Sequence, residues 1–245
     1  MSLAVVHLAR AKNGGDPFEA FADTYAANPA WVPHLRVLLL KGYVPGSLEA
    51  RLLEARWRAL GDPGSARVLV VPDAGYDLGS YALACGLLRE EHVLLTNSFS
   101  RPLRPGWARA IHAAAAEPGV GLAGATGSLE VDPHVRTNAF CAPRRLLLDA
   151  LGGRDPLLLD RWGACALEAG PGSLTRIVRR AGLRAVVVSA EGAVRDVEDA
   201  RDLRVFRWGR QENLLVADNR TDGYERADAA ERASLQRLAW GAVEP

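Results

Sequence analysis

Short aliphatic runs that alternate with helix-like stretches constrain the fold of this 245-residue chain more than any other feature. Each run has about five to seven residues, which suits a buried strand better than a helix. Alternation of such strands with helical segments is typical of a mainly parallel sheet covered by helices on both faces. We therefore predict an α/β domain with strands at residues 3–9, 36–40, 67–71, 92–96, 120–126 and 184–188.

The segments between these strands carry helix signals. Asp16 followed by Pro17 marks the start of a helix over 16–27, and Ser47 is a suitable cap for a helix over 47–60. The spacing of apolar residues in the second helix predicts a buried face made of Leu48, Leu52, Ala55 and Leu60. Further helices are predicted at 80–88, 104–119, 143–151, 172–184 and 227–240.

Between residues 126 and 168 the alternation stops. Apart from the helix at 143–151, this segment is rich in Gly, Pro and Asp and is predicted to be irregular. Long irregular stretches near strand ends are typical of active-site regions in α/β enzymes. Residues 1–205 are expected to form one domain, on which residues 206–245 pack as a loop and a helix.

Composition excludes some classes of protein. A net charge of +1 argues against a dedicated nucleic-acid binder, which needs a concentrated basic surface. The apolar stretch at residues 3–9 is too short for a signal peptide or a membrane span. We expect a cytoplasmic protein, with peripheral association at the inner membrane face left open, and the oligomeric state is undetermined. Three well-separated cysteines are expected to be reduced and buried, namely Cys85, Cys141 and Cys165.

A glycine pattern at residues 119–124 matches the GxGxxG string of dinucleotide-binding proteins. That fingerprint requires a strand before the glycines and a helix after them. Here a predicted helix comes before, and the glycines lie inside the next predicted strand. We interpret them as small residues that permit close packing beneath a ligand.

Two polar clusters follow predicted strands. After the strand at 67–71, carboxylates and glycines alternate, namely Asp73, Gly75, Asp77 and Gly79. The carboxylates could accept hydrogen bonds from a base or ribose, and the glycines could let a ligand approach the backbone; equally, all four could be ordinary turn and cap residues. After the strand at 92–96 comes the polar sequence Asn97-Ser98-Phe99-Ser100-Arg101.

The order of these features resembles the nucleotide-sugar half of family 2 glycosyltransferases with the GT-A fold. The glycine-containing turn at 73–79 leads into a small-residue helix, and residues 97–100 take the place of the metal-binding DxD motif. Similar units follow at 101–107, 120–128 and 167–188, so the resemblance covers residues 3 to about 190. It implies transfer of a sugar from a nucleoside diphosphate donor to a carbohydrate or lipid-linked acceptor, as in polysaccharide biosynthesis, with inversion as the default.

The resemblance departs from the family pattern at two places. Lys41 stands where an aspartate that contacts the base is expected, and both DxD aspartates are replaced by neutral residues. A divalent cation, Mg²⁺ or Mn²⁺, is therefore doubtful, because these ions normally require at least one carboxylate. Either another carboxylate supplies that charge, or cationic side chains in predicted loops neutralise the diphosphate; the candidates are Arg101, His134, Arg136, Arg207 and Arg210.

Glycosyl transfer also needs a base for the acceptor hydroxyl. The resemblance implies Glu168 in that role, with Asp160 as the reserve candidate, although Glu168 could instead be an ordinary capping or turn residue. Trp162 could stack on a sugar or pack in the core. Asp73 and Asp77 are assigned to the nucleoside, and the remaining predicted substrate contacts are Asn97, Ser98, Ser100, Arg101, His134, Arg136 and Asn138.

Two other functions stay open. The chain could be a binding module that retains the nucleotide-sugar fold and has lost catalysis with its metal motif. It could also be a nucleotidyltransferase, which would need a glycine-rich basic loop after the first strand, and residues 8–17 offer a weak version of that loop.

Overall fold

The fold is described by a computed structural model that covers residues 2–241. Its central sheet has eight strands in the order β11-β10-β6-β9-β4-β1-β2-β3. Six of them confirm the predicted strands: β1 Leu3–Arg10, β2 Leu35–Lys41, β3 Ala66–Val71, β4 His92–Thr96, β6 Val120–Gly124 and β10 Arg184–Val188. These pair in parallel wherever they are neighbours, so the predicted α/β fold with a mainly parallel sheet is confirmed.

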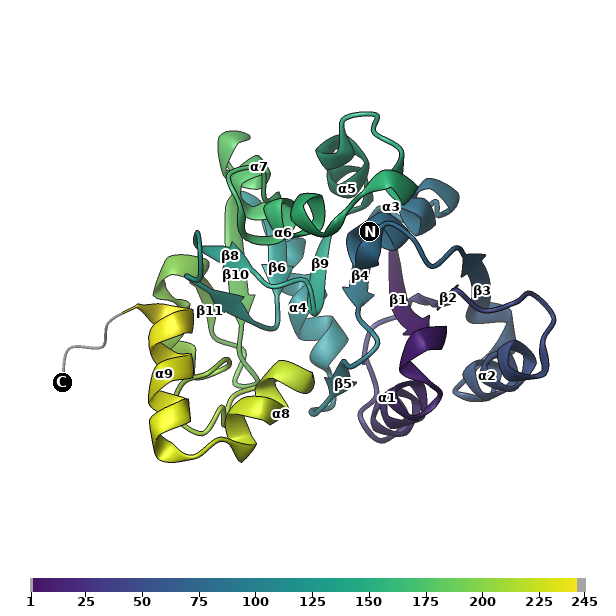
Figure 1. The fold of residues 1–245 in the computed structure, drawn as a ribbon, viewed down its shortest axis with the longest axis horizontal. Helices are drawn as coiled ribbons and strands as arrows, with labels where there is room; N and C mark the ends of the chain where they lie inside the picture. The colour runs from purple at the N-terminus through teal and green to yellow at the C-terminus, as the bar shows by residue number, and fades with distance from the viewer. Residues whose placement is uncertain (1, 242–245) are drawn as a thin grey trace.

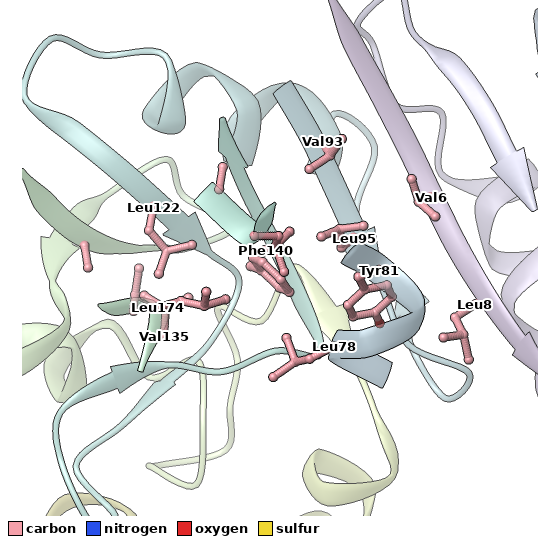
Figure 2. Packing of buried hydrophobic residues seen from close by; sticks show 14 of the residues in the cluster. Val6, Leu8, Leu78, Tyr81, Val93, Leu95, Leu122, Val135, Phe140 and Leu174 are labelled. Carbon is pink, nitrogen blue, oxygen red and sulfur yellow. The ribbon is translucent and has the colours of Figure 1, made fainter. Parts of the chain in front are cut away.

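Helices cover both faces of this sheet, as predicted (Figure 1). The alternation of side chains along β1 shows the two faces directly, because Val6 and Leu8 belong to one buried cluster and Val5 belongs to the other. The first cluster packs under α3 Tyr76–Leu87, α5 Arg144–Leu151 and α7 Leu174–Arg180, and Figure 2 shows part of it. The second packs under α1 Asp16–Ala27, α2 Leu48–Ala59 and α4 Trp107–Ala115.

The predicted buried face of α2 is wrong. Leu48 and Leu52 are 66% and 59% exposed, whereas the buried residues of this helix are Ala50, Leu53 and Trp57. Both sets have helical spacing, so periodicity alone could not choose between them. Trp57 decides the orientation, because its large ring packs against aromatic rings of α1 and is fully buried.

The segment from 126 to 168 is more ordered than predicted. It contains β9 Ala139–Pro143, which lies in the middle of the sheet and pairs antiparallel with β4 and β6. It also contains α6 Arg161–Ala169 and the hairpin of β7 Gly127–Ser128 with β8 His134–Val135. The prediction failed because β9 reads Ala-Phe-Cys-Ala-Pro, which has no β-branched residue, and α6 has no fully buried side chain.

Residues 206–241 contact the rest of the domain through a short strand pair and through side-chain hydrogen bonds. β12 Val216–Ala217 pairs with β5 Arg101–Pro102, and α8 Asn219–Arg226 is followed by α9 Ala229–Trp240. Trp240 is 4% exposed, and its Nε1 donates to the carbonyl oxygen of Phe206 at 2.7 Å. The remaining elements are β11 Val194–Asp196 and four 3-10 helices: η1 Ala11–Asn13, η2 Pro63–Ser65, η3 Pro156–Leu158 and η4 Val197–Leu203. Among residues 2–241, none of the helices has the length and apolar character that a bilayer span requires.

Candidate active site

A cavity of about 600 Å³ lies beside the carboxyl end of β4. Its walls come from the start of α3, the segment between β7 and β9, helix α6 and the C-terminal segment at 206–220. The carboxyl ends of strands in an open α/β sheet are the usual place for a ligand. Seven of the twelve residues predicted for catalysis or substrate contact line it, namely Asp77, Asn97, His134, Arg136, Asn138, Trp162 and Glu168, and so does the further cationic candidate Arg207.

Glu168 is a carboxylate of this cavity that accepts hydrogen bonds from uncharged donors. It stands near the C-terminal end of α6, and its Oε1 accepts from the backbone N–H of Thr137 at 3.1 Å and from the Thr137 hydroxyl at 2.8 Å. None of the ion pairs of the described residues includes Glu168. The carboxylate is therefore oriented through one oxygen without being neutralised by a neighbouring cation.

Asp77, at the start of α3, lies on the same wall. Burial raises its pKa, while Lys41 and Arg10 oppose the increase and the negative charge of Glu168 adds to it. Burial and the negative charge of Glu168 thus both disfavour the ionised form of the Asp77 carboxyl group.

Asp73, in contrast, does not line the cavity. Its carboxylate is 2.7 Å from Nε of Arg10 and 2.9 Å from Nζ of Lys12, and the hydrogen bond from Arg10 is the main reason that its pKa is lowered to about 2. Lys41 is 1% exposed, and its Nζ donates to the carbonyl oxygens of Ala74 and Tyr76. The basic side chains of Arg10, Lys12 and Lys41, at or just after the ends of β1 and β2, thus all contact the loop that follows β3.

Of the two alternatives for Gly75 and Gly79, the structure does not support room for a ligand. A Cβ added at either position would lie 2.2 or 2.3 Å from the carbonyl oxygen of Pro156. The glycines are needed because the backbone of η3 packs directly on the first turn of α3. Since Pro156 is 81 residues further along the chain than Gly75 and 77 further than Gly79, no local pattern could have indicated this contact.

The GxGxxG glycines lie within β6 or just before it, as predicted. A Cβ on Gly121 would lie 2.7 Å from a side-chain carbon of Val178, and one on Gly124 would lie 2.3 Å from Val135. Their smallness therefore serves packing of α7 and β8 against the sheet.

The cluster that follows β4 forms a turn. Asn97 Oδ1 accepts from the backbone N–H of Phe99 at 3.1 Å, and the Ser100 hydroxyl donates to the carbonyl oxygen of Asn138 at 2.6 Å. Ser98 and Ser100 are buried and do not line the cavity, whereas Asn97 does. These oxygens are neutral and hold the turn together, and no three His, Cys, Asp or Glu side chains within residues 2–241 converge on a possible metal position. The residues in this place do not fit a divalent cation.

The predicted cationic residues divide into two groups. Arg101 is turned to a bidentate pair with Asp222, at 2.9 and 2.6 Å, and does not line the cavity; neither does Arg210. Arg136 and Arg207 do line it. His134 lines it as well, with Nδ1 2.8 Å from the carbonyl oxygen of Asp132, and burial lowers its pKa.

Two residues in or next to helix α6 differ from their predicted places. Asp160 is exposed, lies outside the cavity lining and is the N-cap of α6, where Oδ1 accepts from the backbone N–H of Gly163 at 2.7 Å. Cys85 and Cys141 are buried as predicted, but Cys165 is exposed and lines the cavity. The prediction for Cys165 failed because α6 turns its small residues toward the cavity and the solvent.

Several cavity residues were not predicted from the sequence. Glu130, Phe206 and Arg220 each line the wall, and so does Asp218, which forms a buried ion pair with Arg136. At the mouth, Val131 and Trp162 are each 80% exposed. For Glu130, Phe206 and Arg220 the surrounding sequence gave no signal, because each acquires its place in the cavity only through contacts distant in the chain.

Comparisons with known proteins give similarity in structure alone. No family model matches the chain, and no curated protein is similar to it in sequence. Among solved structures, the mannosyltransferase PcManGT from Pyrobaculum calidifontis, in complex with GDP-Man and Mn²⁺, has a TM-score of 0.55 and 16% identity over 84% of this chain. This chain spans 59% of the length of that enzyme.

Two further solved structures are less similar. TarS of S. aureus has a TM-score of 0.44 and 12% identity, over 61% of this chain and 30% of that one. Glucosyl-3-phosphoglycerate synthase from Mycobacterium tuberculosis has a TM-score of 0.42 and 14% identity, over 63% of this chain and 67% of that one. At these identities a comparison shows a shared fold and nothing more. The evidence for that fold is the TM-score of 0.55 with the mannosyltransferase PcManGT.

Proposed function

We propose that this chain, which has the GT-A fold that its sequence resembles, transfers a sugar from a nucleoside diphosphate donor to a hydroxyl group of an acceptor. The observation that carries the proposal is Glu168, a carboxylate that faces the cavity at the sheet's carboxyl edge, fixed by Thr137 and unpaired with any described cation. A carboxylate held in this way can accept a proton from a bound hydroxyl.

Glu168 acts as the general base in this proposal. The acceptor oxygen forms a bond to the anomeric carbon while the bond from that carbon to the phosphate oxygen breaks, and the hydroxyl proton moves to the carboxylate. Since Thr137 occupies Oε1, the atom Oε2 is the one available for the proton. One base on the acceptor side is sufficient for a single displacement, so the expected outcome is inversion at the anomeric carbon.

The rest of the cavity is assigned by chemistry. Asp77, Asn97 and Asn138 offer carboxyl and amide groups suited to sugar hydroxyls, and the 80% exposed indole of Trp162 at the mouth suits an acceptor that is a carbohydrate or is linked to a lipid. The donor class proposed for this chain is that of GDP-Man, the molecule with which the mannosyltransferase PcManGT forms its complex. Five predicted residues do not line the cavity, and we assign them to holding its walls in place: Asp73, Ser98, Ser100, Arg101 and Asp160.

A non-catalytic nucleotide-sugar-binding module is the second candidate. It is favoured by the segment after β4, where the neutral oxygens of Asn97 and Ser100 stand in the place of the DxD carboxylates and hold a turn together. A nucleotidyltransferase is less suited, because Lys12, the cation of its expected loop after β1, pairs with Asp73.

The test compares Glu168→Gln with Asp160→Asn. Donor binding is measured by calorimetry with a panel of nucleoside diphosphate sugars, and transfer by release of the nucleoside diphosphate. Glu168→Gln should bind the donor as the wild type does and lose transfer by about 10²- to 10⁴-fold, which is the usual contribution of a general base. Asp160→Asn keeps the cap oxygen of α6 and should retain both properties. Donor binding with no turnover in the wild type would favour the binding module, and absence of binding for every donor would refute both.

A further inference from the structure

We infer that Arg136 and Arg207, gathered on the ring of Phe206, form an oxyanion site that takes the diphosphate of the donor and does there the work of a divalent cation. The inference deepens the proposed function and rests on it for the identity of the anion. Arg220, which is exposed and lines the same wall, adds a third guanidinium group.

The two arginines converge on one aromatic ring. The Cζ atom of Arg136 lies 4.0 Å from the centroid of Phe206, and that of Arg207 lies 5.0 Å from it. Both side chains are largely withdrawn from water, with 12% and 6% of their surface exposed. Two like charges in such a place raise the electrostatic potential of the cavity wall and favour an anion. Burial, followed by the charge of Arg136, lowers the pKa of Arg207.

The carboxylates nearby do not neutralise both arginines. Asp218 pairs with Nη2 of Arg136 at 2.8 Å, and its other oxygen accepts from the backbone N–H groups of Arg220 and Thr221. Glu130 is the carboxylate nearest Arg207, at 4.0 Å from Nη1, and it is 43% exposed. Since both oxygens of Asp218 are already paired, the counter-charge of Arg207 is the more distant and partly exposed carboxylate of Glu130.

Two buried donors on this wall lack a partner within the described residues. They are Nε of Arg207 and Nδ2 of Asn138, whose side chains line the cavity. The Oδ1 atom of Asn138 is fixed by the Thr126 hydroxyl at 2.6 Å, which leaves its amide nitrogen as the free end. Buried N–H groups are rarely left unpaired in proteins, so a ligand rich in oxygen acceptors is the expected partner.

The backbone at Arg207 is itself held in an unusual conformation. Its φ is +43°, in the left-handed region that non-glycine residues avoid. The side chain of Gln211 maintains it, because Oε1 accepts from the Arg207 backbone N–H at 2.9 Å and Nε2 donates to the carbonyl oxygen of Thr221 at 3.1 Å. Strained residues that surrounding contacts hold in this way are concentrated at functional sites.

These arginines supply the positive charge that a cation held by the missing acidic pair would bring to the diphosphate. In the proposed reaction the electron pair of the broken bond goes to the leaving phosphate oxygen, so the diphosphate gains one negative charge. Preorganised guanidinium groups stabilise that charge through two or more N–H donors each. The neutral oxygens after β4 do not fit a cation, whereas the guanidinium groups of this wall fit an anion.

The experiment measures binding of inorganic pyrophosphate by calorimetry, in EDTA and in Mn²⁺, to the wild type and three variants. Arg207→Met removes the donors and keeps an apolar stem against Phe206, and it should weaken binding by about 10- to 100-fold, as expected for loss of a charge-assisted hydrogen bond. Arg220→Gln, whose side chain is exposed, should weaken it several-fold and reduce its dependence on salt. Arg58→Gln is the control, because Arg58 pairs with Glu54 on the exposed side of α2.

The outcomes separate this inference from the proposed function. Binding in EDTA that is lost in Arg207→Met supports the oxyanion site, whether or not a nucleotide sugar is turned over. Pyrophosphate binding that requires Mn²⁺ and is equal in the wild type, Arg207→Met and Arg220→Gln overturns the site, even if the wild type transfers sugar. Because Arg207 is buried, circular dichroism is used to check that Arg207→Met folds. If it does not fold, the exposed variant Arg220→Gln still tests the site.

Discussion

Asp218 joins the cavity wall to the C-terminal helices, so its replacement tests how the site is held. The residue is fully buried, and its carboxylate accepts from Arg136 and from two backbone N–H groups at the start of α8. Asp218→Ala removes the cap and leaves a largely buried guanidinium without its counter-charge. Breaking a buried pair from one side costs about 3–5 kcal/mol of unfolding free energy.

Asp218→Asn should be milder. The amide oxygen can still cap α8, but the charge that faces Arg136 is lost, so we expect a cost of about 1.5–3 kcal/mol, the range for a hydrogen bond to a charged group. A matched control exists at Asp228, which caps α9 from an exposed position by accepting from the backbone N–H of Glu231 at 2.9 Å. Asp228→Ala should cost about 0.5–2 kcal/mol, as for loss of a cap alone.

The assay is equilibrium unfolding in urea with a shared slope, supported by thermal melts. A loss of about 4 kcal/mol should lower the Tm by about 8–16 °C in a chain of this size. Burial alone would raise the pKa of Asp218, but Arg136 and the backbone N–H groups outweigh it and the pKa is lowered. Its contribution is therefore present above the unfolded value of about 3.9 and is lost as the pH falls through the lower folded value. Equal costs for Asp218→Ala and Asp228→Ala would refute the buried pair.

Two further predictions concern packing and acid stability. Gly79→Ala should lower the free energy of unfolding by about 1–3 kcal/mol, because the added Cβ meets the backbone carbonyl oxygen of Pro156 at 2.3 Å. Gly86→Ala in the same helix has open space and should be neutral or stabilising in urea unfolding. The reverse order of the two variants would contradict the contact with η3. Burial lowers the pKa of His7 to about 3, so the unfolded chain binds a proton below about pH 6.5 that the folded chain does not, and this residue should make stability fall by about 1.4 kcal/mol per pH unit there. His7→Phe should lose that part of the slope between about pH 6 and pH 5, and an unchanged slope would show that His7 titrates normally.

Much of the candidate site followed from local sequence, and the remainder did not. Asn97 was predicted because the end of a buried strand can be located by periodicity, and Glu168 because the resemblance to family 2 glycosyltransferases implies an acidic residue at its position; both line the cavity. Asp73 was assigned to a ligand by the same reasoning, but it pairs with Arg10, a residue 63 positions away. Phe206 gave no signal at all, since an aromatic residue in a loop is common and its two arginine contacts depend on folding.

The sequence by itself determined the six parallel strands, most of the helices between them and the edge of the sheet where polar groups meet. It could do so because burial of an aliphatic run and capping of a helix are properties of neighbouring residues. Only the tertiary structure decided that β9 enters the sheet between β4 and β6, that η3 rests on the glycines of α3, and that Asp218 holds Arg136 across 82 positions of the chain. Those arrangements depend on which surfaces pack together, and a charge or a small residue acquires its role only when that packing brings its partner to it.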